Sequence, residues 1–123
     1  AVGTISINSN GTSVAYNTGS DYRLKQNVVA LTGAKARLNQ LAVKRFDFIS
    51  APGTTVDGFL AHEAATVVPE CINGTKDEVD SNGDPIYQGI DQSKLVPLLT
   101  AALQEAFAEI AALTTRIETL EAG

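Results

Sequence analysis

A chain of 123 residues is long enough for one domain, and its 44% hydrophobic and 19% charged residues exclude wholesale disorder. It has no Trp or Met and only four Phe, so a single chain is expected to have a thin core, or a core completed by other subunits. The net charge of −5 argues against nucleic acid as the main partner.

The charges are unevenly distributed along the chain. Residues 20–45 carry six basic residues and one acid, whereas residues 46–123 carry three basic residues and thirteen acids. We expect the basic segment to be neutralised by the acidic one, within the chain or between copies. The lone Cys71 excludes a disulfide framework and a zinc cluster, and no metal or cofactor is expected. No signal-peptide pattern is visible and no uninterrupted apolar run approaches a membrane span, so no membrane partner is expected.

Residues 1–19 contain two short alternating runs, Thr4–Ile7 and Thr12–Tyr16, around an Asn10-Gly11 pair that is typical of a tight hairpin turn. The hairpin has too few hydrophobic residues to form an independent sheet. We interpret residues 1–19 as the end of a longer β-rich body upstream; a frayed terminal hairpin is the alternative.

Residues 20–91 predict a small α+β core. A helix is expected after Gly33, and the alternation in Lys44–Ile49 predicts a strand that pairs with Val56–Leu60. A short helix stops at Pro69, and the turn over residues 80–85 predicts a second hairpin. Four large apolar residues are expected in the core: Phe46, Phe48, Phe59 and Leu60.

Residues 92–123 predict a long helix, with Pro97 in its first turn and no Gly or Pro from residue 98 to residue 122. Apolar residues occupy both seam positions of four heptads, which predicts a left-handed coiled coil. An amphipathic helix packed on its own domain is the alternative. Isoleucine and leucine at these positions favour two strands in isolation, so the helix alone leaves the number of strands open. The seam residues are Val96, Leu99, Leu103, Ala106, Ile110, Leu113, Ile117 and Leu120.

The motif S-D-Y-R-L-K-Q-N-V at residues 20–28 resembles the signature S-D-x-R-L-K-x-N-I, which opens a known family of domains. Residues 43–48, 58–70 and 90–99 resemble further segments of that family in the same order, so the resemblance covers about residues 20–120. The family is the C-terminal intramolecular chaperone domain of phage tail fibres, tailspikes and endosialidases, classed as self-cleaving serine peptidases of family S74.

The resemblance implies a domain that forms a homotrimer, templates the folding of a fibre upstream in the same chain, and is then released by autoproteolysis. Residues 1–19 would end the fibre, residues 20–91 would form the chaperone core, and residues 92–123 would form a three-stranded coiled coil. The implied location is the phage virion, after synthesis in the cytoplasm of the bacterial host.

The resemblance also implies the site residues. Ser20 would be the nucleophile and Lys25 its general base, with cleavage at Gly19–Ser20 or at Ser20–Asp21; the family favours the second bond. The supporting residues would be Arg23, His62 and Glu63. His62 stands where the family usually has Gln, and we expect it to be a hydrogen-bonded structural side chain rather than a base.

The chemistry of a serine–lysine pair sets a condition on cleavage. A lysine acts as a base only when it is neutral, and its ordinary pKa of ~10.4 must then fall to about 7. This requires an environment that disfavours the charged form by ~4–5 kcal/mol, which a dry site in an assembled structure supplies, with help from a nearby cation such as Arg23. Cleavage is therefore expected to wait for assembly.

The spacing of Ser20 and Lys25 adds a geometric condition. Residues five apart lie ~17 Å apart in a strand and about 140° apart around a helix, so neither element brings them together. The segment must bend, at Asp21-Tyr22, or the base must come from a neighbouring subunit.

Two other functions fit the same sequence less well. One is a structural trimerisation tip that stays on the fibre without cleavage. The other is a receptor- or sugar-binding tip, which needs an exposed aromatic cluster that three Tyr and four Phe make unfavourable. The acidic turn Asp80–Asp84 lacks the ligand spacing of a calcium loop and is expected to be only a turn.

Overall fold

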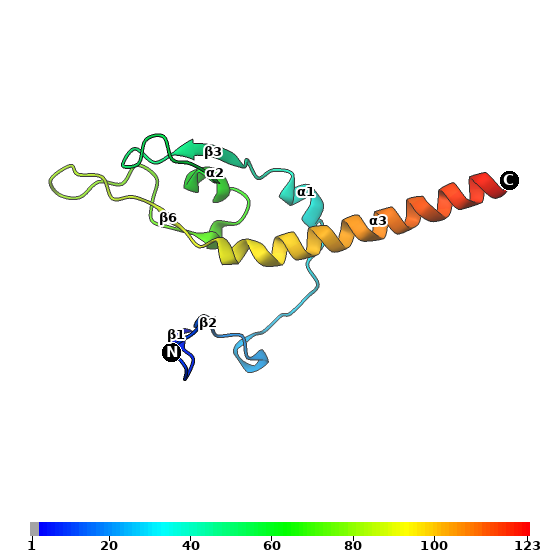
Figure 1. The fold of residues 1–123 in the computed structure, drawn as a ribbon, viewed down its shortest axis with the longest axis horizontal. Helices are drawn as coiled ribbons and strands as arrows, with labels where there is room; N and C mark the ends of the chain where they lie inside the picture. The colour runs from blue at the N-terminus through cyan, green and yellow to red at the C-terminus, as the bar shows by residue number, and fades with distance from the viewer. Residues whose placement is uncertain (1–2) are drawn as a thin grey trace. The chain divides into compact units, whose positions relative to one another are not determined.

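The structure is a computed structural model that describes residues 3–123 (Figure 1). The chain forms two compact units, the first ending at Ala30 and the second spanning Leu31–Gly123. Each unit is described here by itself.

The first unit begins with the expected hairpin. Strand β1 (Gly3–Ile7) pairs antiparallel with β2 (Val14–Thr18), and Ile5 lies opposite Tyr16. The connection is wider than the expected two-residue turn because the Asn8 side chain fills it, accepting hydrogen bonds from the backbone N–H groups of Thr12 and Ser13. No residue from Gly3 to Ala30 is buried, so the apolar face of the hairpin lies open.

The second unit begins with a short helix and a hairpin. Helix α1 (Ala34–Leu38) is shorter than expected and is followed by a turn. Strand β3 (Lys44–Asp47) pairs antiparallel with β4 (Thr55–Gly58), with Phe46 opposite Val56. The predicted pairing of these two segments is confirmed.

The chain then forms short elements. Helix α2 (Ala61–Ala64) ends well before Pro69, where the sequence predicted the end of a short helix, and a 3₁₀ turn, η2 (Pro69–Cys71), begins at that proline. Strand β5 (Ile72–Asn73) pairs with β6 (Gly89–Ile90), and the loop between them carries a single bridge from Val79 to Pro85. The described residues therefore form three separate two-stranded pieces rather than one sheet.

The longest element is helix α3 (Val96–Ala122), which follows a 3₁₀ turn, η3 (Gln92–Leu95), and is drawn from yellow to red in Figure 1. Its bounds agree with the prediction from the sequence. The missing N–H of Pro97 costs nothing in the first turn, because that group has no partner within a helix.

The core of the second unit is small. Its eight buried hydrophobic residues come from α1, α2, the link from α2 to η2, η2, η3 and the first turns of α3: Ala34, Ala64, Val67, Val68, Cys71, Leu95, Leu98 and Ala102. Phe59 packs against this core, and Phe46 is half-buried and meets Phe48 edge to face at 5.2 Å between ring centroids. Phe48 and Leu60 are exposed, so their prediction as core residues was wrong. An isolated pair of strands offers such residues no second layer to pack against.

Helix α3 packs on its own unit through one face only. Leu98 and Ala102 are buried in the core, and further along the helix both Glu105 carboxylate oxygens accept backbone N–H groups of α1, from Ala34 at 3.0 Å and Lys35 at 2.7 Å. Gly33 precedes α1 with a φ of 67° and has no side chain to cap it, so Glu105 takes that role. The face that carries the heptad seam is not used in these contacts.

By length and composition, the helical stretch Gln92–Ala122 is also apolar enough to cross a membrane, with a mean hydropathy of 1.4 over 18 residues. This is weak evidence for a span, because a coiled-coil helix has a similar composition. Glu105 binds the start of α1 and Glu109 pairs with Lys35, so these two carboxylates hold the middle of the helix against a folded protein segment.

Candidate functional site

A single 3₁₀ turn, η1 (Tyr22–Leu24), separates Ser20 from Lys25. The N–H of Leu24 donates to the Asp21 carbonyl at 3.0 Å, and the N–H of Lys25 donates to the Tyr22 carbonyl at 3.1 Å. Asp21 and Lys25 flank the turn in extended conformations. Of the two arrangements that the spacing allows, a bend within the chain is therefore present in the structure.

The bend brings the two proposed catalytic side chains together. The Lys25 Nζ donates a hydrogen bond of 2.9 Å to the Ser20 Oγ, which is the contact that proton transfer from a serine to a lysine requires. Both side chains are exposed, as is every residue from Gly3 to Ala30. In a single chain the pair therefore has the right contact but lies in water.

Asp21 and Arg23 form a close ion pair on the same turn. Asp21 Oδ1 accepts from the backbone N–H of Arg23 and from its Nε, both at 2.9 Å, and Oδ2 accepts from Nη2 at 2.8 Å. The Arg23 side chain, and then its backbone N–H, hold the pKa of Asp21 below its ordinary value, and Asp21 raises the pKa of Arg23. Arg23, which the sequence suggested as a helping cation, is thus paired with Asp21.

The other two supporting residues lie on α2 in the second unit. His62 is exposed and borders a surface depression of about 440 Å³ together with Asp77 and Tyr87. Its side chain makes no hydrogen bond within residues 3–123, so the expected structural hydrogen bond is not found. Glu63 has one buried carboxylate oxygen without a hydrogen bond, and the nearest cation, Lys44 Nζ, lies 3.8 Å away.

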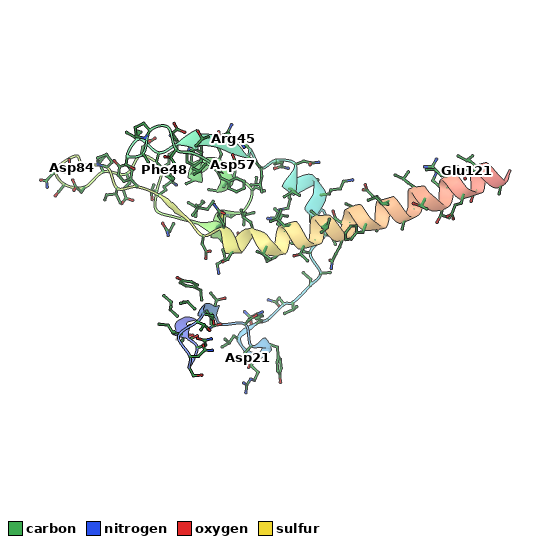
Figure 2. All side chains as sticks on the ribbon, viewed as in Figure 1. Asp21, Arg45, Phe48, Asp57, Asp84 and Glu121 are labelled. Carbon is green, nitrogen blue, oxygen red and sulfur yellow. The ribbon has the colours of Figure 1, made fainter. Side chains whose placement is uncertain are left out.

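The basic segment is partly neutralised within the chain. Lys35 pairs with Glu109, Lys44 with Glu63, and Arg45 with Asp57 at 2.8 Å on the β3–β4 pair, where Figure 2 labels both side chains. These pairs are exposed and each stabilises the fold by less than about 1 kcal/mol. Their arrangement agrees with the within-chain form of the charge prediction.

The acidic segment Asp80–Asp84 forms a turn, as predicted. Asp80 Oδ1 accepts the N–H groups of Asn82 at 2.8 Å and Asp84 at 3.0 Å, so its oxygen is used within the loop. Among residues 3–123, no three side chains of the metal-binding types lie together.

The second candidate site is the seam of α3. Seven of its eight residues are exposed, from 49% at Leu99 to 76% at Leu120, and the eighth, Ala106, is half-buried. Figure 2 shows side chains projecting all around the end of α3 near Glu121, with no other element of the same unit beside it. The helix therefore carries a continuous apolar stripe that its own unit leaves uncovered.

Sequence reasoning missed the capping roles of two residues that shape these sites. Glu105 caps a helix that lies 71 positions earlier in the chain, and no local pattern could have indicated this contact. Asp21 caps η1, and here a signal was available, because aspartate is a preferred residue at the start of a helical turn.

A comparison with protein families matches part of the chain. Residues 20–73 fit the model of Peptidase_S74, which is described as the chaperone of endosialidase. The matched segment starts at Ser20, includes Lys25, and continues through α1, β3, β4 and α2 to β5. No curated protein matches the chain. The segment that holds Ser20 and Lys25 therefore matches the family that the sequence motifs indicated, and that resemblance is confirmed over residues 20–73.

Proposed function

We propose that this chain is an intramolecular chaperone that trimerises, templates the folding of a phage tail fibre or tailspike upstream, and is released by autoproteolysis next to Ser20. The observation that carries the catalytic part is the hydrogen bond of 2.9 Å between Lys25 Nζ and Ser20 Oγ. It joins the only two side chains that a minimal serine peptidase needs.

The assembly part of the proposal rests on the uncovered stripe of α3. At ~1.5 Å per residue, its 27 residues span roughly 40 Å, enough for four heptads of contact. The heptad residues favour two strands in isolation, and the resemblance to trimeric fibre proteins favours three. We therefore assign three copies.

A trimer of this kind aids folding upstream by raising the local concentration of the chains. Joining three chain ends makes later pairing effectively intramolecular, at millimolar effective concentrations. This matters for a β-rich fibre, because pairing between distant strands is slow. The hairpin β1–β2 fits this role, because its apolar face, which carries Ile5 and Tyr16, has no partner within its own unit.

The cleavage step uses only groups of the chain and one water. The Ser20 Oγ attacks a backbone carbonyl carbon while the Lys25 amine takes the hydroxyl proton and passes it to the departing backbone nitrogen. The C–N bond breaks and an ester on Ser20 forms. Water then hydrolyses the ester, which regenerates the Ser20 hydroxyl and leaves a new carboxylate.

The geometry of attack separates the two candidate bonds. Attack by Ser20 on the Gly19 carbonyl of its own chain closes a five-membered ring, whereas attack on its own carbonyl would close a strained four-membered ring. Cleavage at Gly19–Ser20 therefore fits a pair acting within one chain. Cleavage at Ser20–Asp21 requires the Ser20 Oγ of another copy.

Exposure of the pair explains how cleavage is timed. In a single chain the pair is hydrogen-bonded but lies in water. Assembly that covers Ser20 and Lys25 removes water and favours the neutral amine. The cut thus follows folding of the trimer.

The test follows the intact mass of the purified protein over time, beside its sedimentation behaviour. We expect trimers, and a chain shortened at Gly19–Ser20 or Ser20–Asp21. Ser20→Ala should keep the trimer and the full-length mass, while Ser13→Ala, a change at another exposed serine of the same unit, should cleave like the wild type. A folded protomer that stays alone would overturn the assembly proposal.

The alternative is a structural trimerisation tip that remains on the fibre. It predicts trimers whose wild-type and Ser20→Ala chains have identical masses on a denaturing gel at every time. Because Ser20 and Lys25 are exposed in the single chain, the same experiment also tests this alternative.

A further inference from the structure

The ion pair of Asp21 and Arg23 has a consequence for the neighbouring Ser20–Lys25 pair. Between Gly3 and Ala30 the only charged side chains are Asp21, Arg23 and Lys25, and the only other titratable side chains are Tyr16 and Tyr22. All of them are exposed. Asp21 and Arg23 are therefore the two charged side chains of this segment that accompany Lys25 on the turn.

The same ion pair also fixes the path of the backbone. Asp21 Oδ1 accepts the N–H of Arg23 and thereby caps η1, while the guanidinium binds both carboxylate oxygens and holds the cap in place. The turn places Lys25 at its end, where its side chain returns to Ser20. Loss of the cap would let Lys25 move away along an extended chain.

Arginine suits position 23 because its guanidinium binds Asp21 through both carboxylate oxygens. Lysine at this position would keep the charge but lacks the planar fork that makes two parallel bonds.

We propose that Asp21 and Arg23 are positioning residues of the cleavage reaction: together they hold the turn that brings Lys25 to Ser20. This inference rests on the proposed autoproteolysis. It predicts that the cleavage rate follows the cap of η1, whereas assembly into trimers does not.

The role of Arg23 is tested by the intact mass and the sedimentation of the full-length protein. Arg23→Gln should cleave more slowly than the wild type, because glutamine cannot bind both Asp21 oxygens as a guanidinium does, while its trimers still form. Arg23→Lys should cleave at an intermediate rate, since it keeps the charge but lacks the planar fork. Equal cleavage rates in Arg23→Gln and the wild type, or loss of trimers in Arg23→Gln, would overturn the proposal.

The role of Asp21 is tested by the same two measurements. Asp21→Ala should cleave about ten-fold or more slowly than the wild type, and Asp21→Asn, which keeps a capping oxygen but loses the ion pair, should recover part of that loss. Equal rates in Asp21→Ala and the wild type would remove the positioning role. Wild-type protein that does not cleave overturns the proposed autoproteolysis instead, and NMR contacts between the Ser20 and Lys25 side chains, compared in the wild type and Asp21→Ala, then decide the positioning role.

Discussion

The hydrogen bond between Ser20 and Lys25 is not by itself enough to make the pair reactive. Their hydrogen bond of 2.9 Å has the length needed for proton transfer, yet both side chains are exposed. A hydrogen bond between exposed groups competes with water and has a small net free energy. We therefore expect the pair to become reactive only when a covering surface excludes that water.

Replacing Lys25 tests its role as the base. Lys25→Ala should lower the cleavage rate by roughly 10²–10⁴-fold, because the serine loses its proton acceptor, while trimers still form. Lys25→Arg is the matched control for charge, since a guanidinium has a similar reach but cannot give up its proton, and it should be equally inactive. Intact mass and sedimentation are the measurements. Loss of trimers in either variant would assign Lys25 to structure.

Glu105 is the residue that joins α1 to α3. Backbone hydrogen bonds, first from Lys35 and then from Ala34, hold the pKa of the Glu105 carboxyl below its ordinary value. Since the folded-state pKa is lower than the unfolded one of ~4.3, the ionised form adds stability above that pH. The contribution is lost as the pH falls through the folded-state pKa.

Glu105→Gln should therefore melt at a lower temperature than the wild type at pH 7, and the difference should shrink as the pH is lowered from 5 towards 3. Circular dichroism at each pH measures both melting temperatures. Glu118→Gln, an exposed change that removes the same charge further along α3, should follow the wild type throughout. A gap between Glu105→Gln and the wild type that persists unchanged at pH 3 would contradict this account.

Two faces of helix α3 differ in their contacts. Leu98, Ala102 and Glu105 serve the contacts within the unit, and the heptad residues lie on the stripe that these contacts leave free. The sequence allowed either a coiled coil or a helix packed on its own domain. The helix is packed on its own unit over its first turns, by a face other than the seam.

Charges placed in the seam test its role in assembly. Ile110→Asp together with Ile117→Asp should abolish trimers, because buried unpaired carboxylates are strongly unfavourable between helices. The control pair, Ala111→Asp with Thr115→Asp, adds the same two charges at exposed positions outside the seam and should leave the trimer intact. Light scattering measures the mass of each variant. Trimers in the seam variant would mean that another element assembles the protein.

At the scale of the whole molecule, the two units differ in what holds them together. No residue between Gly3 and Ala30 is buried, whereas the second unit has its own core of eight residues. Cys71 lies in that core with 1% of its surface exposed, and burial raises the pKa of its thiol. Its reactivity therefore reports on whether the second unit is folded.

A thiol reagent should modify Cys71 at least ~100-fold more slowly in native buffer than in denaturant, because both burial and the raised pKa keep the reactive thiolate scarce. The variant Ser81→Cys adds an exposed thiol in the turn and should show one fast and one slow phase. Absorbance of the released thiol product gives both rates. Two fast phases would mean that the core around Cys71 opens readily.

The sequence predicted the elements whose signals are local. The strand pair β3–β4 follows from alternation, and α3 from its seven-residue spacing and the absence of Gly and Pro, so both agree with the structure. The exposure of Phe48 and Leu60 was not predicted, since a strand pattern indicates which residues share a face but not whether another layer covers it.

The sequence by itself determined the family motif, the long helix and the residue types of the serine–lysine pair, because motif and period are properties of neighbouring residues. Only the tertiary structure decided that a 3₁₀ turn closes the gap from Lys25 to Ser20, since one irregular turn has no period to detect. It also decided that Glu105 caps α1 and that the seam of α3 stays uncovered. These depend on where distant segments of the chain meet, which no pattern within one segment encodes.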